Sequence, residues 1–311
     1  MYQSLIKNDE PFSEKLIDSL ERIPPEDLSS LLTRYTEHAP LSLALREINR
    51  FAVLQKELKP MGVNSDSKIL DVGCGDGFWW SLLGSARPKV FGIDISKKEL
   101  SKTNFLSAIE TCDISDENSL RVLQNKAWPV NFDVVIGNCS LEHVLQLDAA
   151  LHNIAKLTAQ GGYFLLFVPT QTWAMQGKSL FFLSKYLPRI AMTISGALNG
   201  FFQHWHLMTD KSWCAVLEKQ GFTVEKIIYM GNKKSEFLFR LFLPSAYFSY
   251  LFKTITGLGY FNPFIPKWVS RQLVSWVVTY LTTNKTPNTP IDYDQKRFSY
   301  EYAFVCKKSK I

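Results

Sequence analysis

The chain has 311 residues, of which 46% are hydrophobic and 21% charged, a balance that supports a sizeable core and argues against wholesale disorder. Its formal charge of +6 fits an anionic ligand or a membrane surface and does not by itself indicate nucleic acid. The five cysteines contain no C-x-x-C pair, so we expect neither a metal site nor a disulfide framework, and a reducing compartment is favoured. The first residues carry mixed charges and no apolar segment suited to a signal peptide. We therefore expect a cytoplasmic protein, with peripheral membrane attachment left open.

Residues 1–60 are predicted to form a helical cap ahead of the main fold. Ser13 is a candidate N-cap for the first helix. The apolar positions of that helix, at helical spacing, are Leu16, Ile17, Leu20 and Ile23. A second helix begins at "PPEDLSSLLTRY", and "PLSLALREINRFAVLQKEL" carries a third apolar stripe. Arg46 and Arg50 lie one turn apart on this third helix, where a solvated face is the favoured interpretation.

From Lys68 onwards, short apolar runs alternate with helical segments. The expected strands cover residues 68–72, 89–95, 105–114, 132–138, 163–169, 222–230 and 299–308. A helix over 148–160 is expected to end at Gly161 and Gly162, which form a C-cap signal, and another helix covers 210–221. Strands that alternate with helices indicate βαβ units, so the predicted class is α/β with a Rossmann-like doubly wound sheet.

The stretch "ILDVGCGDGFWW" places Gly73, Gly75 and Gly77 between the first of these strands and a predicted helix. A glycine-rich turn at that point lets a ligand approach the backbone and the helix N-terminus. The spacing is G-x-G-x-G with Phe78 in the sixth position, so the dinucleotide pattern G-x-G-x-x-G is not met. The P-loop pattern fails too, because no Gly-Lys-Ser/Thr follows.

These motifs together resemble the class I S-adenosylmethionine-dependent methyltransferases, in particular the small-molecule, methyltransferase type 11-like branch. "LDVGCGDG" is similar to their first motif, "CDI" and "FDVVIGNCSLEHV" to the ends of their third and fourth strands, and "GGYFLLFVPT" to their fifth. "HWHLMTDKSWCAVLEKQGFTV" is similar to a later helix and strand. The resemblance covers about 68–168, 204–230 and the last strand, which it implies is antiparallel.

The resemblance implies S-adenosylmethionine as the cofactor and gives roles to several residues. Asp94 would accept both ribose hydroxyls, Asp113 would lie at the adenine, and Asp71 would attract the ammonium through water. The glycines would admit the methionine moiety. Structural alternatives are a strand-end cap for Asp94, a turn residue for Asp113 and a small residue in a tight turn for Cys74. The predicted cofactor-binding residues are Asp71, Gly73, Cys74, Gly75, Gly77, Asp94, Ile95, Asp113, Ile114 and Asn138.

Asn138, Ser140 and His143 follow the fourth strand, where the reactive methyl group should lie in an open α/β sheet. His143 is a candidate general base, or it caps a helix or packs beside the cofactor. His204 and His206 flank Trp205, and one of them is a candidate for facing the substrate. The candidate catalytic residues are thus His143, His204 and His206. A base is not essential, because the sulfonium is already a strong electrophile and alignment supplies much of the acceleration.

Other positions near these motifs have a structural interpretation. Trp79 and Trp80 are expected to pack the segment after the glycines onto the sheet. Contact of Arg46 or Arg50 with the cofactor carboxylate is the alternative to their solvated face.

Two aromatic insertions, 171–208 and 232–297, interrupt a core made of 61–231 and 298–311. In the second, the uncharged runs are too short for a transmembrane helix, which needs roughly twenty apolar residues. Its basic residues interleaved with aromatic ones are Arg240, Lys253, Lys267 and Arg271. Three interpretations remain open: a cap over a lipophilic substrate, a surface at a bilayer interface, or a plain structural subdomain.

The predicted function is methyl transfer to an O, C or N nucleophile of a small, lipophilic or aromatic acceptor. Methylation of a polar metabolite or saccharide, with the insertions as a dimer interface, is the alternative. RNA or protein methylation and a non-catalytic cofactor-binding module are more remote, because "GNCSLEHV" lacks a Pro-Pro-Tyr type motif and no RNA-binding motif is appended. We therefore expect a small-molecule partner and no nucleic acid, and the oligomeric state stays open.

Overall fold

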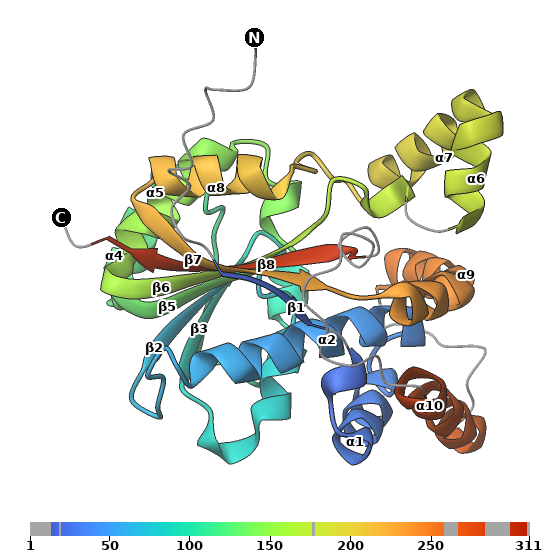
Figure 1. Ribbon diagram of the computed structural model, residues 1–311. Helices are drawn as coiled ribbons and strands as arrows, with labels where there is room; N and C mark the ends of the chain where they lie inside the picture. The colour runs from blue at the N-terminus through green and yellow to red at the C-terminus, as the bar shows by residue number, and fades with distance from the viewer. Residues whose placement is uncertain (1–13, 19, 176–177, 258–266, 284–298, 310–311) are drawn as a thin grey trace, which may run out of the picture.

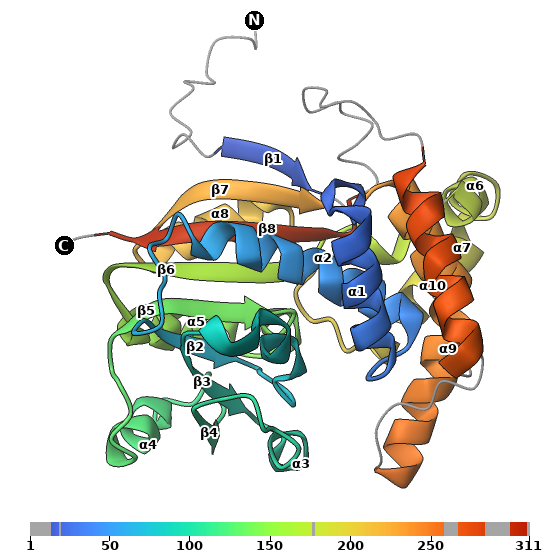
Figure 2. The same ribbon diagram turned by 90° about the horizontal axis from the view of Figure 1, so that it is seen from below.

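The computed structural model describes residues 14–18, 20–175, 178–257, 267–283 and 299–309. The described residues form one eight-stranded sheet in the order β1-β7-β8-β6-β5-β2-β3-β4. Figure 1 shows this sheet edge-on, and Figure 2 shows its strands side by side in that order. β8 is antiparallel to β6 and β7, and the other pairs are parallel. The predicted α/β sheet with an antiparallel last strand is confirmed. The strands are β1 (Glu14–Asp18), β2 (Lys68–Val72), β3 (Lys89–Asp94), β4 (Ala108–Thr111), β5 (Phe132–Asn138), β6 (Thr158–Pro169), β7 (Phe222–Met230) and β8 (Glu301–Lys308).

Helices cover both faces of this sheet and extend beyond one end of it (Figure 1). One face carries α1 (Pro25–Thr36), α2 (Leu41–Leu58) and the 3-10 turns of η2 (Phe78–Ala86). The other face carries α4 (Ser119–Asn125), α5 (Leu147–Leu157) and α8 (Asp210–Lys219). The insertions form α6 (Lys178–Tyr186), α7 (Pro188–Phe201), α9 (Lys233–Thr256) and α10 (Lys267–Thr282). The short elements are η1 (Leu20–Arg22), α3 (Lys97–Leu100), η3 (Leu141–His143) and η4 (Trp173–Met175).

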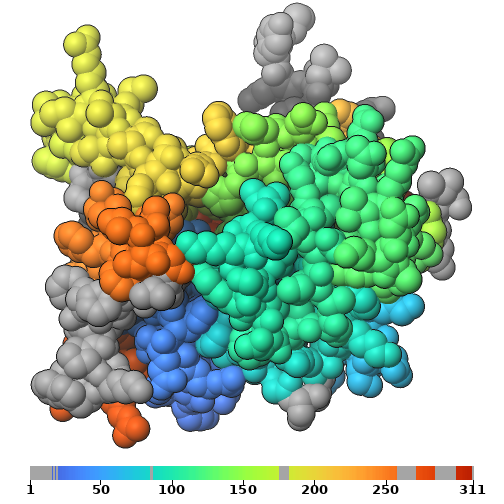
Figure 3. All heavy atoms as spheres, turned by 180° about the vertical axis from the view of Figure 1, so that it is seen from behind, coloured from blue at the N-terminus to red at the C-terminus, as the bar shows by residue number. Residues whose placement is uncertain are grey.

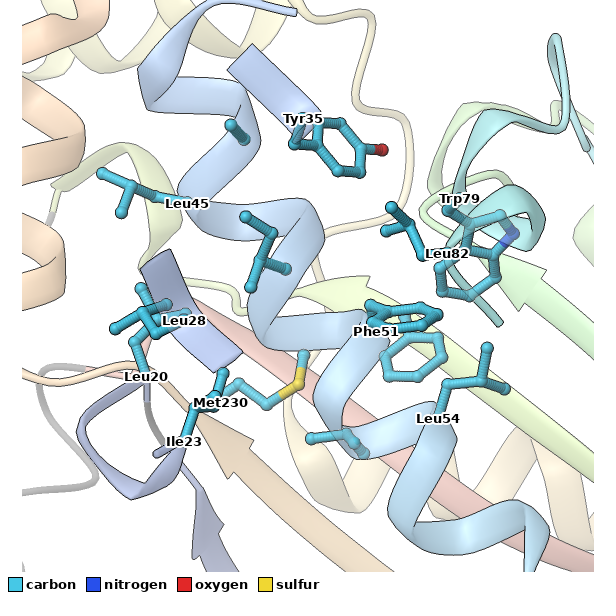
Figure 4. Packing of buried hydrophobic residues seen from close by; sticks show 14 of the residues in the cluster. Leu20, Ile23, Leu28, Tyr35, Leu45, Phe51, Leu54, Trp79, Leu82 and Met230 are labelled. Carbon is cyan, nitrogen blue, oxygen red and sulfur yellow. The ribbon is translucent and has the colours of Figure 1, made fainter. Parts of the chain in front are cut away.

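Alternate side chains of the strands enter two separate hydrophobic clusters. Ile69 of β2 packs on the α2 side, whereas the next residue, Leu70, packs on the α5 side. This alternation follows from the pleat of a strand, and it makes the strands apolar on both faces. Trp79 and Trp80 are buried in the cluster that contains Phe51 of α2 (Figure 4). Their predicted role in packing is therefore confirmed for both indoles.

The predicted first helix is wrong, because Glu14–Asp18 forms strand β1. This strand pairs in parallel with β7, so that Leu16 lies opposite Ile228. Without it, β7 would present an open row of N–H and C=O groups at the edge of the sheet. Leu20 follows in the η1 turn and is fully buried, and Ser13 lies outside the described residues. The second and third predicted helices are confirmed as α1 and α2.

Two further boundaries differ from the sequence prediction. The helix expected to end at Gly161 and Gly162 ends at Leu157, and both glycines belong to β6. A Cβ at Gly162 would lie 2.9 Å from the carbonyl oxygen of Asp133, so close backbone approach explains this glycine. The segment after the glycine loop forms 3-10 turns with a break at Gly84, where a regular helix was expected.

The predicted solvated face for Arg46 and Arg50 is also wrong. Arg46 is 8% exposed and Arg50 4%, and both guanidinium groups donate to the carboxylate of Glu301, which is fully buried. Arg50 also pairs with Glu47 on its own helix. The helical stripe could not reveal this, because Arg46 and Glu301 are 255 residues apart in the sequence.

The second insertion packs against the N-terminal helices. α9 packs against α2, and α10 packs against α1, beside which it lies in Figures 1 and 2. Among the described residues, no helix is both long enough and apolar enough to cross a bilayer. Asn232 caps α9, accepting from the backbone of Lys234 and Ser235.

Candidate active site

The three glycines of the loop after β2 all have positive φ, but they serve different purposes. A Cβ at Gly73, where φ is +75°, would lie 2.4 Å from Cβ of Ser140, so this glycine lets the loop pack on the end of β5. At Gly77, the nearest side chain is Leu106. A Cβ at Gly75 would meet nothing within 4 Å. The space beside Gly75 is therefore open, whereas Gly73 is the loop glycine that lines the cavity described below.

Asp94 lies at the end of β3 and binds the same loop. Its Oδ2 accepts from the backbone N–H of Gly75 at 2.9 Å, and its Oδ1 accepts from that of Ser96 at 2.7 Å. Asp113 follows β4, is exposed and accepts from the backbone and hydroxyl of Ser115. Asp94 and Asp113 thus make the local turn contacts of the structural alternative, and both also line one large cavity.

This cavity has a volume of about 1400 Å³ and joins the glycine loop to the two insertions. On the sheet side, the residues that line it include Gly73, Asp94, Ile95, Asp113 and Ile114. On the insertion side, apolar side chains of α7 and α9 line it, including Leu198, Phe201, Leu243 and Tyr247. Figure 3 shows α7 and α9 side by side, bordering the part of the core that carries β3 and β4. The cavity therefore has a polar end at the strands and an apolar roof.

Asp71 differs from the other predicted cofactor residues, because it is 1% exposed and points into the core. Its Oδ2 accepts from the indole nitrogens of Trp80 at 2.6 Å and Trp79 at 3.3 Å, and its Oδ1 has no hydrogen-bond partner. Burial raises the pKa of this carboxyl to about 7, although the two indoles oppose the shift. Cys74 is buried likewise and packs against Gly92, and burial raises the pKa of its thiol. Asp71 and Cys74 therefore pack on the core side of the glycine loop.

The end of β5 brings the predicted residues Asn138 and Ser140 together with two that sequence reasoning missed, Cys139 and Glu47 of α2. The side-chain amide of Asn138 donates to Glu47 of α2 at 3.4 Å, and its Oδ1 has no partner. Cys139, which lines the cavity, has the unusual φ of +49°, and Arg50 donates to its sulfur at 2.9 Å. Ser140 donates to the carbonyl of Val72 at 2.6 Å. α2 thus forms one wall of the site, for which its apolar stripe gave no signal.

Two of the three candidate histidines meet beside this strand end. The rings of His143 and His204 stack with centroids 5.4 Å apart. His143 lines the cavity, its side chain is 40% exposed, and its Nδ1 lies 3.1 Å from the carbonyl oxygen of Gln203. The Nε2 of His206 lies 2.7 Å from the carbonyl oxygen of Val144. This contact holds the end of the first insertion against the segment after β5, and His206 does not join the other two histidines.

The two imidazoles differ in their suitability as a base. Burial, helped by His143 and Arg46, lowers the pKa of His204 to about 3, so His204 is neutral at physiological pH and a poor proton acceptor. His143 is more exposed and lines the cavity, which leaves it as the better-placed base. Burial also raises the pKa of the neighbouring Glu142.

Comparison with known proteins agrees with this geometry. A family described as "Methyltransferase domain" matches residues 35–227, more than half of the chain. A ubiquinone biosynthesis O-methyltransferase of an Azoarcus strain is 30% identical over 95 residues, covering 30% of this chain and 41% of that protein. One of Yersinia pestis is 29% identical over 129 residues, covering 40% and 52%. The chain thus spans about half the length of these curated relatives.

A solved structure of a protein provisionally assigned as a sarcosine dimethylglycine methyltransferase from Galdieria sulphuraria shares the fold. Its TM-score is 0.51 at 9% identity, with 87% of this chain and 88% of that chain covered. The chain belongs to the methyltransferase domain family, and the predicted membership of the class I S-adenosylmethionine-dependent methyltransferases is confirmed. It is an enzyme of that class.

The buried carboxyl of Asp71 predicts a distinctive dependence of stability on pH. Its folded pKa of about 7 lies above the ordinary value of 3.8, so the unfolded chain loses this proton first as the pH rises. The stabilisation is fully present below about pH 4 and is lost between there and about pH 7. The asparagine of Asp71→Asn can still accept from both indoles but does not ionise, so the stability of this variant should not fall over that pH range. Its free energy of unfolding relative to the wild type should therefore rise by roughly 3–4 kcal/mol between about pH 4 and pH 8 in urea titrations. A constant difference would show that Asp71 titrates normally.

Proposed function

We propose that this enzyme transfers the methyl group of S-adenosylmethionine to a small lipophilic or aromatic acceptor bound beneath α7 and α9. The observation that carries this proposal is the single cavity that runs from Asp94 and Asp113 to the apolar side chains of the insertions. Cofactor and acceptor need adjacent space, and a largely apolar site with a few convergent polar groups is typical of small-molecule binding. The apolar roof supports a lipophilic acceptor over a polar metabolite or saccharide.

The residues of the loop fit the polar parts of the cofactor. Asp94 would accept the ribose hydroxyls while it still holds the N–H of Gly75, because a carboxylate offers about four lone-pair sites. Asp113 and the buried Ile114 would flank the adenine, and the backbone at Gly73, which lines the cavity, would face the methionine end. Asn138 offers an unpaired amide oxygen as an acceptor nearby.

The reaction needs alignment and the removal of one proton. A lone pair of the acceptor attacks the methyl carbon, the carbon–sulfur bond breaks, and its electrons return to sulfur as the cofactor becomes a neutral thioether. An oxygen nucleophile releases its proton to a base, and His143 is the titratable imidazole that lines the cavity. The two curated relatives are named as O-methyltransferases, which supports oxygen as the nucleophile. The covering helices would exclude water and hold the reactants in line.

The role of Asp94 is tested by substitution with alanine. Asp94→Ala should weaken the binding of S-adenosylhomocysteine by about 2–3 kcal/mol, roughly 30- to 150-fold, because hydrogen bonds to a charged group are lost. Asp116→Ala is the matched control, since Asp116 accepts from Asn118 in a similar turn but does not line the cavity. Isothermal calorimetry measures both variants. An affinity for Asp94→Ala within twofold of the wild type would exclude Asp94 as the ribose ligand.

The acceptor site is tested at its roof. Phe201 of α7 lines the cavity, and its ring contacts those of Tyr247 and Tyr250 on α9. Phe201→Ser should weaken the binding of an apolar naphthalene-type fluorescent probe about tenfold or more, because a large apolar contact is removed. Affinity for S-adenosylhomocysteine should stay within about twofold. Phe182→Ser, at an exposed ring of α6 that does not line the cavity, is the control. Equal probe binding by the two variants would contradict a roof made by α7.

We also propose that the outer surface of the insertions contacts a lipid bilayer, from which a lipophilic acceptor would enter. Exposed apolar side chains gather on these helices: Phe182, Tyr186, Ile190 and Met192 on α6 and α7, and Phe237, Leu241, Phe248 and Ile255 on α9. The electrostatic part of the predicted contact is weaker than the sequence suggests. Arg240 pairs with Glu236, and Lys253 lies 3.3 Å from Glu99, so two of the four basic residues are engaged within the molecule.

Vesicle co-sedimentation tests this surface. Combined Phe182→Ser, Ile190→Ser and Met192→Ser should reduce binding to phosphatidylcholine–phosphatidylserine vesicles about tenfold or more, since exposed apolar area supplies the attraction. Arg240→Gln should have little effect on binding, because this side chain is held by Glu236. Vesicle binding by the triple variant equal to that of the wild type would reject the surface, and a large loss with Arg240→Gln would restore the electrostatic account.

A further inference from the structure

Three potential ligand groups for a metal ion converge beside the acceptor cavity. One ligand atom each from Glu142, His143 and His204 lies within 4.8 Å of the others. Glu142 and His143 belong to η3, immediately after β5, and His204 follows α7 at the end of the first insertion. The backbone N–H groups of Trp205 and His206 donate to the carbonyl oxygen of Glu142, at 2.8 and 3.2 Å. The chain is thus fixed where these side chains meet.

Two of the three groups carry a buried polar atom that has no hydrogen-bond partner. Glu142 is 1% exposed, and its Oε2 has no hydrogen-bond partner. The Nδ1 of His204 is buried and has no partner either. A buried carboxylate oxygen without a hydrogen-bond partner is costly. A bound cation would remove that cost.

The histidines present the forms that metal binding requires. With its Nδ1 3.1 Å from the carbonyl of Gln203, His143 is expected to carry its proton there, which leaves the lone pair of Nε2 free, 3.7 Å from Oε1 of Glu142. Such a backbone hydrogen bond to the second ring nitrogen is usual for metal-binding histidines. The Nδ1 of His204 has no hydrogen-bond partner among the described residues, so it too is available as a ligand.

The surrounding charges permit a cation. The guanidinium of Arg46 lies 5.6 Å from the ring centroid of Trp173. The ring of Trp173 also contacts that of His204, with centroids 4.8 Å apart. Arg46 is itself paired with the buried Glu301. The carboxylate of Glu142 therefore remains available to compensate the charge of a bound ion.

We propose that Glu142, His143 and His204 bind a divalent transition-metal ion at the wall of the acceptor cavity. Two imidazoles and one carboxylate suit zinc, cobalt, manganese or ferrous iron. Tetrahedral zinc keeps its ligand atoms about 3.4 Å apart, so the side chains need to close by roughly 1 Å.

Three protein ligands leave a coordination position for water or substrate, as in catalytic zinc sites. His143 lines the cavity, which places that position within reach of an acceptor. If the proposed function holds, an acceptor hydroxyl on the bound ion would lose its proton more easily, to water, and become the better nucleophile. The ion would then replace His143 as the group that promotes this step, because Nε2 of His143 would be bound to it. The metal site itself does not depend on the identity of the acceptor.

Cobalt titration of the chelator-treated, full-length protein tests the proposal. Co²⁺ should bind with one-to-one stoichiometry and give the visible absorption bands of a low-coordinate nitrogen–oxygen site, which Zn²⁺ should abolish by displacement. Zn²⁺ should also raise the midpoint of thermal unfolding, since an ion that binds only the folded state stabilises it. Absence of both signals in the wild type would overturn the proposal.

Two variants and one control locate the site. Glu142→Gln preserves the shape of the side chain, and His204→Phe preserves the ring contacts with Trp173 and Phe202. Each should weaken Co²⁺ binding roughly a hundredfold or more, because loss of even an outer-shell partner costs 10- to 100-fold. His152→Asn, at an exposed residue of α5, should bind like the wild type. Co²⁺ binding that survives both site substitutions would overturn the proposal.

Calorimetry with S-adenosylhomocysteine on the same proteins separates the two proposals. Affinity should stay within about twofold in Glu142→Gln and His204→Phe, because neither residue belongs to the predicted cofactor-binding set. Cofactor binding without metal binding would overturn the metal site alone. Metal binding without cofactor binding would contradict the proposed function and leave the metal site standing.

Discussion

The buried carboxylate of Glu301 is the contact that joins the distant parts of this chain. It accepts from Arg46 and Arg50 of α2, although it belongs to the last strand of the sheet. Breaking a buried ion pair by removing one partner typically costs 3–5 kcal/mol, because the remaining charge stays buried without compensation. Here one carboxylate compensates two guanidinium groups. The position of α2 therefore depends on Glu301, which lies in the last strand and follows both insertions in the sequence.

The same cluster sets the walls of the cavity. The guanidinium of Arg46 lies among the rings of Trp173, Phe239 and Tyr300, which come from the first insertion, from α9 and from the residue before β8. Arg50 extends to Cys139 at the end of β5. The insertions are thus attached to the sheet through aromatic contacts with a cation whose charge Glu301 balances.

Local patterns allowed the sheet and the loop to be predicted, and distant partners explain the errors. Apolar runs, glycine spacing and the strand-end position of Asp94 lie within short segments, so the sequence indicated them directly. Leu16, Leu20 and Ile23 fit a helix as well as the observed strand and turn, and only the open edge of β7 decides between them. Arg46 and Arg50 appeared solvated because Glu301 is remote in the sequence. The meeting of His143 and His204 likewise depends on the path of the first insertion.

Two carboxylates on neighbouring strands show how burial separates roles that their sequence positions make look alike. Asp71 ends in the core beneath the glycine loop, where two indole N–H groups bind it and its pKa lies near neutrality. Asp94 is half-buried at the rim, where it binds the backbone of the same loop and lines the cavity. A carboxyl that is partly neutral at physiological pH and enclosed by tryptophans is suited to supporting the loop, whereas one at the rim is accessible to a ligand's hydroxyls. Asp71 and Asp94 therefore differ because their side chains reach opposite sides of the glycine loop. The indoles of Trp79 and Trp80 bind Asp71, whereas Asp94 binds the backbone of the loop.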